Sequence, residues 1–381
     1  MICARITGIG ETAVGRLPDR DSLALHAEAA SATLADAGAE WRQVDGLLTC
    51  GSFVDRYPRH ALSVAEYLGL CEQLTACQSI HMGGASATMA VAQAKLWIES
   101  GLCRSVLVLG ADNQATGLSR DAAVEMYARF RHPDYEVPFG LLNPSGYALL
   151  AAAHMHRFGT RPEQLAEVAV SIRHWARLNP TALYREPLEV ADVLASRTIS
   201  SPLKLLECSA LADGGGGLLL QAGQSSAGGV AIVGHGVGFT HDHVIQAPDL
   251  TSSGARLSGK RAFAMAGLSP DQIQVAELYD SYTIAVIIQL EDLGFCGPGE
   301  GGLFVEEQGI RPGGALPVAT HGGLLSHAHP GAPGGIFHLT EAVRQLRGTA
   351  TGRQVPNIRH ALVHGEGGIL SANCTLILTQ G

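Results

Sequence analysis

The chain has 381 residues, of which 46% are hydrophobic and 16% are charged, so it can bury a large core. Its net charge of -9 and the lack of a basic block weigh against a nucleic-acid partner, and no apolar run reaches the ~20 residues that span a membrane. The eight cysteines form no C-x-x-C pair, which weighs against a zinc ribbon or a disulfide framework. Reduced thiols and a start without signal-peptide features favour a cytoplasmic protein.

The first half of the chain alternates predicted strands and helices. A strand over residues 4–10 is followed by a helix over 22–38 and a strand over 43–51. A glycine turn and helix, HMGGASATMAVAQAKLWIESG, then cover 81–101 and lead into the strand RSVLVLGAD at 104–112. The apolar core of this last strand is typical of a buried central strand.

Residues of about 115–200 interrupt this pattern. They are rich in polar residues, proline and helix formers, which indicates a mostly helical insertion that caps the site. The first half resumes at 201–223 with SPLKLLECSALADGGGGLLLQAG.

The second half repeats the order of the first. A strand at 231–238, a helix at 254–267 and the strand QVAELYD at 274–280 match the opening of the chain. The turn and helix HAHPGAPGGIFHLTEAVRQLRG at 327–348 then lead into RHALVHGEGG at 359–368. Strands that alternate with helices predict parallel β structure covered by helices. We therefore expect an α/β protein of two similar halves with a site between them.

The repeat, the insertion and four local motifs resemble the thiolase superfamily over essentially the whole chain. The most specific motifs are, in order, AELYDSYT, LPVATHGGLLSHAHPGAPGG, EAVRQLRG and ALVHGEGG. They are similar to the sterol-carrier-protein-type thiolases and their bacterial thiolase-like relatives. The resemblance implies a thiolase fold with α-β-α-β-α layers. Its halves would be residues 1–228, including the inserted loop domain, and residues 229–381.

The resemblance places the nucleophile position of thiolases at Gly84. Thiolases carry a cysteine there, at a helix N-terminus that lowers the pKa of a thiol, whereas glycine cannot form an acyl-enzyme. Cys77 lies too early for that turn, and we expect it to be a buried strand residue. Ser86 lies near the same helix start and would either cap the helix or, if a base touches it, act as a nucleophile.

Tyr279 and His329 occupy two further motif positions. Tyr279 stands where sterol-carrier thiolases have the first residue of H-D-x-F, which helps to bind the thioester oxygen or a water. His329 stands in Ala328-His329-Pro330, where thiolases have G-H-P, a motif whose histidine activates a cysteine or contributes to an oxyanion hole. We expect these two residues to form the acid–base pair and His321 to line the pocket. A tyrosine at a strand end can, however, also be satisfied by the backbone alone.

The last family motif, C-x-G-G-G, reads HGEGG at 364–368. His364 is nearest to the missing acid–base cysteine, and the amides of Gly367 and Gly368 could approach a substrate. Cys374, in the strand that follows, is expected in the core.

Without either cysteine the chain cannot hold an acyl group as thiolases do while CoA enters. A retro-aldol cleavage needs no acyl-enzyme, because a base removes the β-hydroxyl proton of a 3-hydroxyacyl-CoA and donors stabilise the thioester enolate that is left. Bacterial thiolase-like aldolases that shorten steroid side chains lack the cysteine and use a tyrosine at the position of Tyr279. They carry a second tyrosine where this chain has His329. The resemblance thus implies a retro-aldol lyase for acyl-CoA, with a steroid side chain as one candidate substrate.

Two other functions fit the sequence. One is an acetyl-CoA acyltransferase or thiolase with another nucleophile, and the other is a non-catalytic subunit that binds acyl-CoA. Retention of Tyr279 and His329 favours the lyase over the subunit, and Gly84 disfavours the transferase.

The resemblance also implies partners and cofactors. CoA would enter as part of the substrate and product, with no permanently bound cofactor or metal. A homodimer is expected, in which the strand SVLVLG at 105–110 would form either a subunit contact or an internal strand. A small partner protein with an OB-fold and often a zinc ribbon is expected too. No motif selects the residues that contact CoA.

Overall fold

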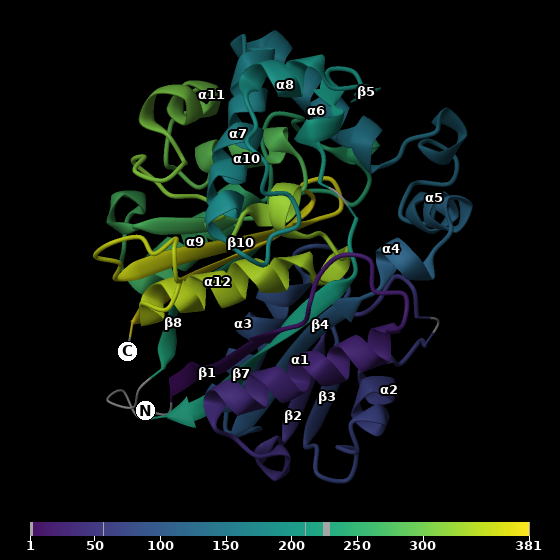
Figure 1. Cartoon of the computed structure of the whole chain (residues 1–381), viewed down its shortest axis with the longest axis vertical. Coiled ribbons are helices and arrows are strands. Elements are labelled where there is room, and N and C mark those ends of the chain that lie inside the picture. Colours follow the sequence, from purple (N-terminus) through teal and green to yellow (C-terminus); the bar gives the residue numbers. More distant parts are fainter. Residues whose placement is uncertain (1–2, 56, 210, 224–228, 381) are drawn as a thin grey trace.

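The computed structural model describes residues 3–55, 57–209, 211–223 and 229–380. Its main sheet has the strand order β3-β2-β4-β7-β1-β8-β11-β10-β9 (Figure 1). The first-half strands are β1 (Cys3–Glu11), β2 (Gly46–Thr49), β3 (Ala76–Ser79), β4 (Ser105–Asp112) and β7 (Gly214–Gly223). The second-half strands are β8 (Val230–Phe239), β9 (Val275–Leu278), β10 (His360–Gly367) and β11 (Ala372–Gln380).

The two halves have the same topology, as the internal repeat predicts. In the first half β1 and β7 are antiparallel, β7 and β4 are antiparallel, and β4 and β2 are parallel. In the second half β8 and β11, β11 and β10, and β10 and β9 pair in the same three ways. β1 and β8 pair only over two residues each, so the halves meet at a narrow seam. The expected boundary at 228/229 falls beside residues 224–228, which lie outside the described residues.

Helices cover the sheet in three layers. The first-half helices are α1 (Ser22–Ala37), α2 (His60–Tyr67) and α3 (Ser86–Glu99), and the second-half helices are α9 (Ala255–Ala266), α10 (Thr283–Asp292), α11 (Gly301–Leu303) and α12 (Gly335–Arg347). α1 and α2 pack on the outer face of the first half, and α9 packs on β8 and β11. α3 and α12 touch each other and strands of both halves, so they form the middle layer (Figure 1).

Local sequence explains where these helices begin and end. The Asp21 carboxylate accepts a hydrogen bond from the Ala24 amide at the start of α1, and Gly38 ends the helix in the left-handed conformation that glycine adopts without strain. α3 carries small and apolar residues on nearly all sides, and most of them are buried. A helix of that composition fits a middle layer rather than a surface.

The insertion packs on the second half although it belongs to the first half of the sequence. It contains α4 (Gln114–Gly117), α5 (Arg120–Ala128), α6 (Asn143–Phe158), α7 (Pro162–Leu178), α8 (Val190–Ala195), β5 (Thr198–Ser200) and β6 (Leu203–Lys204). α6 and α7 contact α10, at the end of the molecule away from α1 and α2 (Figure 1). One apolar cluster joins α6, α7, α9 and α10. The insertion therefore bridges the two halves.

The structure corrects one prediction and decides another. Cys77 is exposed rather than buried, because β3 is the edge strand of the sheet and pairs only with β2 among the described residues. SVLVLG lies in β4, which pairs with β2 on one side and β7 on the other, so it is an internal strand. Cys374 is buried in β11, as expected. Among the described residues, no helix has the length and apolar character needed to cross a membrane.

Candidate active site

The candidate site lies where the starts of the two middle helices meet the end of β9. Gly84 lies in the turn before α3, and residues 328–334 lead into α12. A Cβ placed on Gly335 would lie 2.8 Å from the Gly84 carbonyl oxygen, so the two helix starts approach each other closely. A Cβ on Gly334 would lie 3.3 Å from Tyr279 Oη and 3.1 Å from His329 Cδ2. The two predicted acid–base residues thus lie at the junction of the halves.

Tyr279, His329 and Ser209 form a row of hydrogen bonds. Tyr279 Oη lies 3.0 Å from His329 Nε2, and His329 Nδ1 lies 2.7 Å from Ser209 Oγ. The Gly331 carbonyl lies 3.2 Å from Tyr279 Oη and is an alternative acceptor for the single phenol proton. Because a serine hydroxyl can donate or accept, either neutral tautomer of His329 is satisfied. A proton can therefore move between Tyr279 and His329 while the far side of the imidazole stays bonded to Ser209.

The backbone around Tyr279 fixes the position of its ring. The Tyr279 amide donates to the His364 carbonyl at 3.0 Å, and the Gln289 side-chain amide donates to the Tyr279 carbonyl at 2.9 Å. The next residue, Asp280, accepts hydrogen bonds from the amides of Leu324 at 2.7 Å and Leu325 at 3.1 Å. These amides belong to the turn η7 (Gly323–His327), so Asp280 also anchors the segment that delivers His329.

Burial keeps both members of the pair neutral near pH 7. It raises the pKa of Tyr279 well above its ordinary value of 10, and the Glu366 carboxylate adds to this rise. Burial lowers the pKa of the half-buried His329 to about 4. Tyr279 is thus a phenol, and His329 is a neutral imidazole that can accept a proton.

The phenol of Tyr279 occupies the space that a side chain at position 84 would need. A Cβ on Gly84 would lie 2.5 Å from Tyr279 Oη, and closer still to Tyr279 Cζ and to the Glu366 carbonyl oxygen. Ordinary van der Waals contact for a Cβ begins near 3.4 Å. Glycine at 84 and tyrosine at 279 are therefore complementary, and a cysteine could not occupy position 84 beside this phenol.

Ser86 and the glycine loop at the end of β10 shape the same turn. The buried Ser86 hydroxyl donates to the Gly83 carbonyl at 2.6 Å and accepts from the Met82 amide at 2.9 Å, so it closes the turn before α3. A Cβ on Gly367 would collide with the Met82 carbonyl oxygen. Gly368 has a φ of 72° in the left-handed region. The loop can pass this close to the turn only because it carries glycine there.

Two predicted histidines lie away from the Tyr279–His329 pair. Both ring nitrogens of His364 bond to β11, with Thr375 Oγ1 2.8 Å from Nδ1 and Asn373 Oδ1 3.1 Å from Nε2. Burial lowers the pKa of His364 to about 4. His321 places Nδ1 3.2 Å from Glu277 Oε2 and is buried. Neither side chain has a described hydrogen bond to Tyr279 or His329.

His321 belongs to a buried ionic cluster below Tyr279. His338 lies 3.6 Å from Glu277 and 3.4 Å from Asp280, which raises its pKa to about 9, while the two histidines hold the pKa of Glu277 at about 2. Ligand atoms of Glu277, His321 and His338 lie within 4.8 Å of one another, the arrangement in which a metal could be held. The carboxylates of Glu277 and Asp280 balance the charge of a protonated His338. Because His338 lies on α12 and Glu277 lies on β9, these ion pairs hold α12 against β9.

The structure adds residues that no family motif singles out. Ser209 follows the insertion and reaches His329 across 120 positions of the chain. Glu366 is the one ionisable side chain in the loop HGEGG apart from His364, and its carbonyl borders Gly84. An ionisable residue inside a glycine-rich motif was the signal that could have identified Glu366. Ser209 had no such signal.

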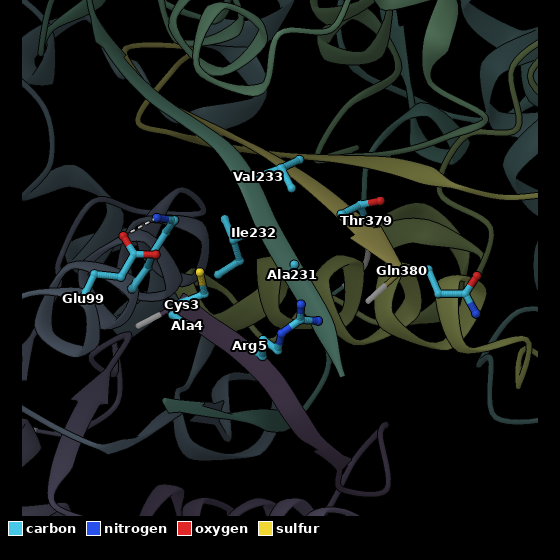
Figure 2. Close-up of a pocket in the computed structure, with 10 residues that line it drawn as sticks. Cys3, Ala4, Arg5, Glu99, Ala231, Ile232, Val233, Thr379 and Gln380 are labelled. Carbon is cyan, nitrogen blue, oxygen red and sulfur yellow. Dashed lines mark hydrogen bonds and ion pairs between the residues drawn. The ribbon is translucent and has the colours of Figure 1, made fainter. Parts of the chain in front are cut away.

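A separate cavity of about 500 Å³ lies at the other end of α3 (Figure 2). Lys95 and Glu99, near the end of the helix, line it together with the first residues of β1 and β8. Gly84 precedes the start of α3, and a 14-residue helix is about 20 Å long. The cavity is therefore remote from Tyr279.

Comparison with known proteins agrees with this geometry. Residues 236–380 match the family described as "Thiolase C-terminal domain-like". The chain is 33% identical over 390 residues to 17-hydroxy-3-oxo-4-pregnene-20-carboxyl-CoA lyase of Mycobacterium tuberculosis, covering 98% of each protein. It is 32% identical over 389 residues to the steroid side-chain-cleaving aldolase of Thermomonospora curvata, covering 98% of this chain and 97% of that protein.

Solved structures give the same result. The structure of the "Ltp2-ChsH2(DUF35) aldolase" superposes with a TM-score of 0.88 at 32% identity, covering 99% of this chain and 98% of that one. A monomeric SCP2-thiolase-like protein of Mycobacterium smegmatis superposes with a TM-score of 0.76 at 21% identity, over 99% of this chain and 76% of that one, and this supports the fold alone. The chain belongs to the thiolase superfamily, in its sterol-carrier-protein-type thiolase-like branch.

Proposed function

We propose that this protein is a lyase that cleaves the Cα–Cβ bond of a 3-hydroxyacyl-CoA by a retro-aldol reaction, without an acyl-enzyme. The observation that carries the proposal is the packing at Gly84. A phenol that is hydrogen-bonded to His329 stands where a nucleophile would have to stand. The lyase and aldolase names of the two relatives support the same reaction class.

The row of hydrogen bonds suits removal of the β-hydroxyl proton. The substrate hydroxyl gives its proton to Tyr279 Oη as the Tyr279 proton passes to His329 Nε2, 3.0 Å away. Ser209 bonds to the other nitrogen and orients the resulting imidazolium. The electrons of the O–H bond then form the product carbonyl, and those of the Cα–Cβ bond form the thioester enolate.

The helix starts suit stabilisation of that enolate. α3 and α12 both begin beside Tyr279, and the positive ends of helix dipoles favour negative charge. Glycine at 334, 335, 367 and 368 keeps side chains away from this point. A thioester oxygen could therefore approach backbone N–H groups directly.

A steroid side chain is the acyl group that we propose, because the names of both relatives refer to steroid substrates. CoA would be part of the substrate and product rather than a bound cofactor.

We also propose two protein contacts. One is a homodimer through β3, whose outer edge has no partner strand among the described residues. The other is a small partner with an OB-fold and a zinc ribbon, since the name of the similar Ltp2-ChsH2(DUF35) aldolase joins two components. The start of the insertion offers a surface for it, because five large apolar side chains are exposed there. They are Val124, Phe130, Tyr135, Val137 and Phe139, the last of them 83% exposed.

A panel of thioesters tests the proposed function. The purified protein, with and without the candidate partner, would be incubated with 3-hydroxyacyl-CoA and 3-ketoacyl-CoA substrates in the presence or absence of free CoA. We expect a ketone or aldehyde and a shorter acyl-CoA from the 3-hydroxyacyl-CoA without free CoA. Cleavage of 3-ketoacyl-CoA that requires free CoA would instead show an acyltransferase. Tight thioester binding without turnover would show a non-catalytic subunit.

A further inference from the structure

The Glu366 carboxyl is a buried polar group beside the Tyr279–His329 pair. Its side chain is 1% exposed. Oε1 accepts hydrogen bonds from Tyr147 Oη at 2.5 Å and from Ser281 Oγ at 2.7 Å. Oε2 is buried and is bonded to no side chain among the described residues. The Leu370 backbone amide also acts on the carboxyl and lowers its pKa. One oxygen of the carboxyl is thus held by two hydroxyls, and the other carries no side-chain hydrogen bond.

Burial raises the pKa of the Glu366 carboxyl to about 7. Among the described residues no basic side chain forms an ion pair with this carboxyl or contributes to its pKa, and its side-chain partners are two hydroxyls. The titratable groups that face it are the phenols of Tyr147 on α6 and of Tyr279 and Tyr282 after β9. Arg131 lies behind Tyr147 and Tyr282 and acts on those two phenols. A neutral carboxyl is therefore within reach at physiological pH.

Two observations place Glu366 next to the reacting groups. Its carbonyl oxygen and the Tyr279 ring together block the Cβ position of Gly84. Its carboxylate is also the charge that most raises the pKa of Tyr279, ahead of the adjacent Asp280. Ser281, which holds the carboxyl, is two residues from Tyr279. The carboxyl therefore lies near enough to the phenol to act on its pKa, and the backbone of the same residue borders the Gly84 turn.

The proposed reaction moves two protons, and the Tyr279–His329 pair accounts for one. We propose that Glu366 is the acid that gives a proton to Cα of the thioester enolate, while Tyr279 and His329 take the proton of the β-hydroxyl. This assignment rests on the proposed function and deepens it.

The groups of the site account for both protons of the reaction. The electron pair of the broken Cα–Cβ bond resides in the enolate and forms a new Cα–H bond with the Glu366 proton. Glu366 is left as a carboxylate and His329 as an imidazolium. Solvent returns the His329 proton to Glu366 before the next turnover, and nothing is oxidised or reduced.

A purely structural role makes a different prediction. Glu366 could serve only to tie Tyr147 of α6 to Ser281. A glutamine at 366 would keep this tie, because its amide oxygen accepts the same two hydrogen bonds. It would remove the proton that titrates. Glu366→Gln therefore separates the two roles.

Exchange of Cα hydrogen in D2O is the test. Acetyl-CoA and propanoyl-CoA would be incubated with the protein, and mass spectrometry would follow deuterium at Cα. This half-reaction needs the Glu366 carboxylate but no β-oxygen. We expect the wild-type rate to rise with pH through about 7. We expect Glu366→Gln to exchange at least ~100-fold more slowly and to cleave the 3-hydroxyacyl-CoA correspondingly slowly, with an unchanged melting temperature.

Two further variants make the result specific. Asp292→Asn, which removes another carboxyl of raised pKa near the end of α10, should exchange as the wild type does. Tyr279→Phe should lose cleavage and keep exchange. Wild-type exchange by Glu366→Gln, or its loss only in Tyr279→Phe, would overturn the assignment. If Glu366→Gln does not fold, a wild-type exchange rate that is flat between about pH 6 and 8 would overturn it. Failure of the proposed function is distinguishable, because the wild type would then release no ketone or aldehyde.

Discussion

Replacement of Gly84 by alanine tests the complementarity between this glycine and Tyr279. The added Cβ would lie 2.5 Å from Tyr279 Oη, where 3.4 Å is ordinary contact, so the phenol must move by about 1 Å. It cannot move freely, because backbone hydrogen bonds fix the residue on both sides and the Glu366 carbonyl also blocks the Cβ. Overpacking of this kind costs about 1–3 kcal/mol, and a 1 Å displacement of a catalytic group can cost about 100-fold in rate.

We therefore expect Gly84→Ala to unfold with about 1–3 kcal/mol less free energy in urea and to lose about 100-fold or more in kcat/KM. A double-mutant cycle with Tyr279→Ala is the control, because removal of the ring should relieve part of the stability loss. Equal stability losses in both backgrounds would show that the ring is not the obstacle. Wild-type stability and activity of Gly84→Ala would refute the packing argument itself.

Three further outcomes follow from the geometry. Tyr279→Phe should lower kcat for cleavage by about 10²–10⁴ while the melting temperature stays near that of the wild type, and an active Phe variant would exclude the phenol as proton carrier. Ser209→Ala removes the hydrogen bond to His329 Nδ1. It should lower kcat by about 10-fold in steady-state kinetics and the free energy of unfolding by about 1 kcal/mol in urea denaturation. An unchanged kcat would mean that this hydrogen bond does not orient the His329 ring. Burial lowers the pKa of His364 from 6.5 to about 4. Between these two pH values the unfolded state binds more protons than the folded state, so the free energy of unfolding falls as the pH drops from about 6.5 to 4. His364→Gln should flatten this decline in pH-dependent urea titrations, and an unchanged slope would contradict the buried neutral imidazole.

Much of the fold could be predicted because the internal repeat consists of short sequence patterns, each of which indicates one helix, strand or turn. A glycine turn, a helix and an apolar strand recur in the same order, and each signal reports only on its own segment. The failure at Cys77 has a different origin. A strand pattern does not reveal which strand lies at the edge of a sheet, and β3 lies there, so its side chains are exposed.

Some residues of the candidate site could also be predicted from local patterns, and others could not. Tyr279 and His329 could be chosen because each stands at a motif position of the family that the chain resembles, and His329 also precedes a glycine-rich turn. The structure brings the two side chains to 3.0 Å. His364 was chosen by position as well, but its direction depends on the neighbouring strand, where Asn373 and Thr375 take both nitrogens. Ser209 owes its place to a contact between segments 120 residues apart, which no local pattern encodes.

The role of Gly84 follows only when the sequence and the structure are considered together. The family resemblance shows only that a glycine stands where thiolases carry the nucleophilic cysteine, which excludes an acyl-enzyme at this position. The structure shows that the Tyr279 ring fills that space, so the two residues belong together. Under the proposed function, the glycine at 84 makes room for the phenol of the acid–base pair.

The most direct test of this account follows the protein and its products together during turnover. Wild type and Tyr279→Phe would be mixed with a 3-hydroxyacyl-CoA and no free CoA, and mass spectrometry would record the released ketone or aldehyde and the intact protein mass. The account predicts cleavage by the wild type with no added acyl mass, and loss of cleavage in Tyr279→Phe. An acyl adduct on the wild-type protein, or full cleavage by Tyr279→Phe, would contradict it.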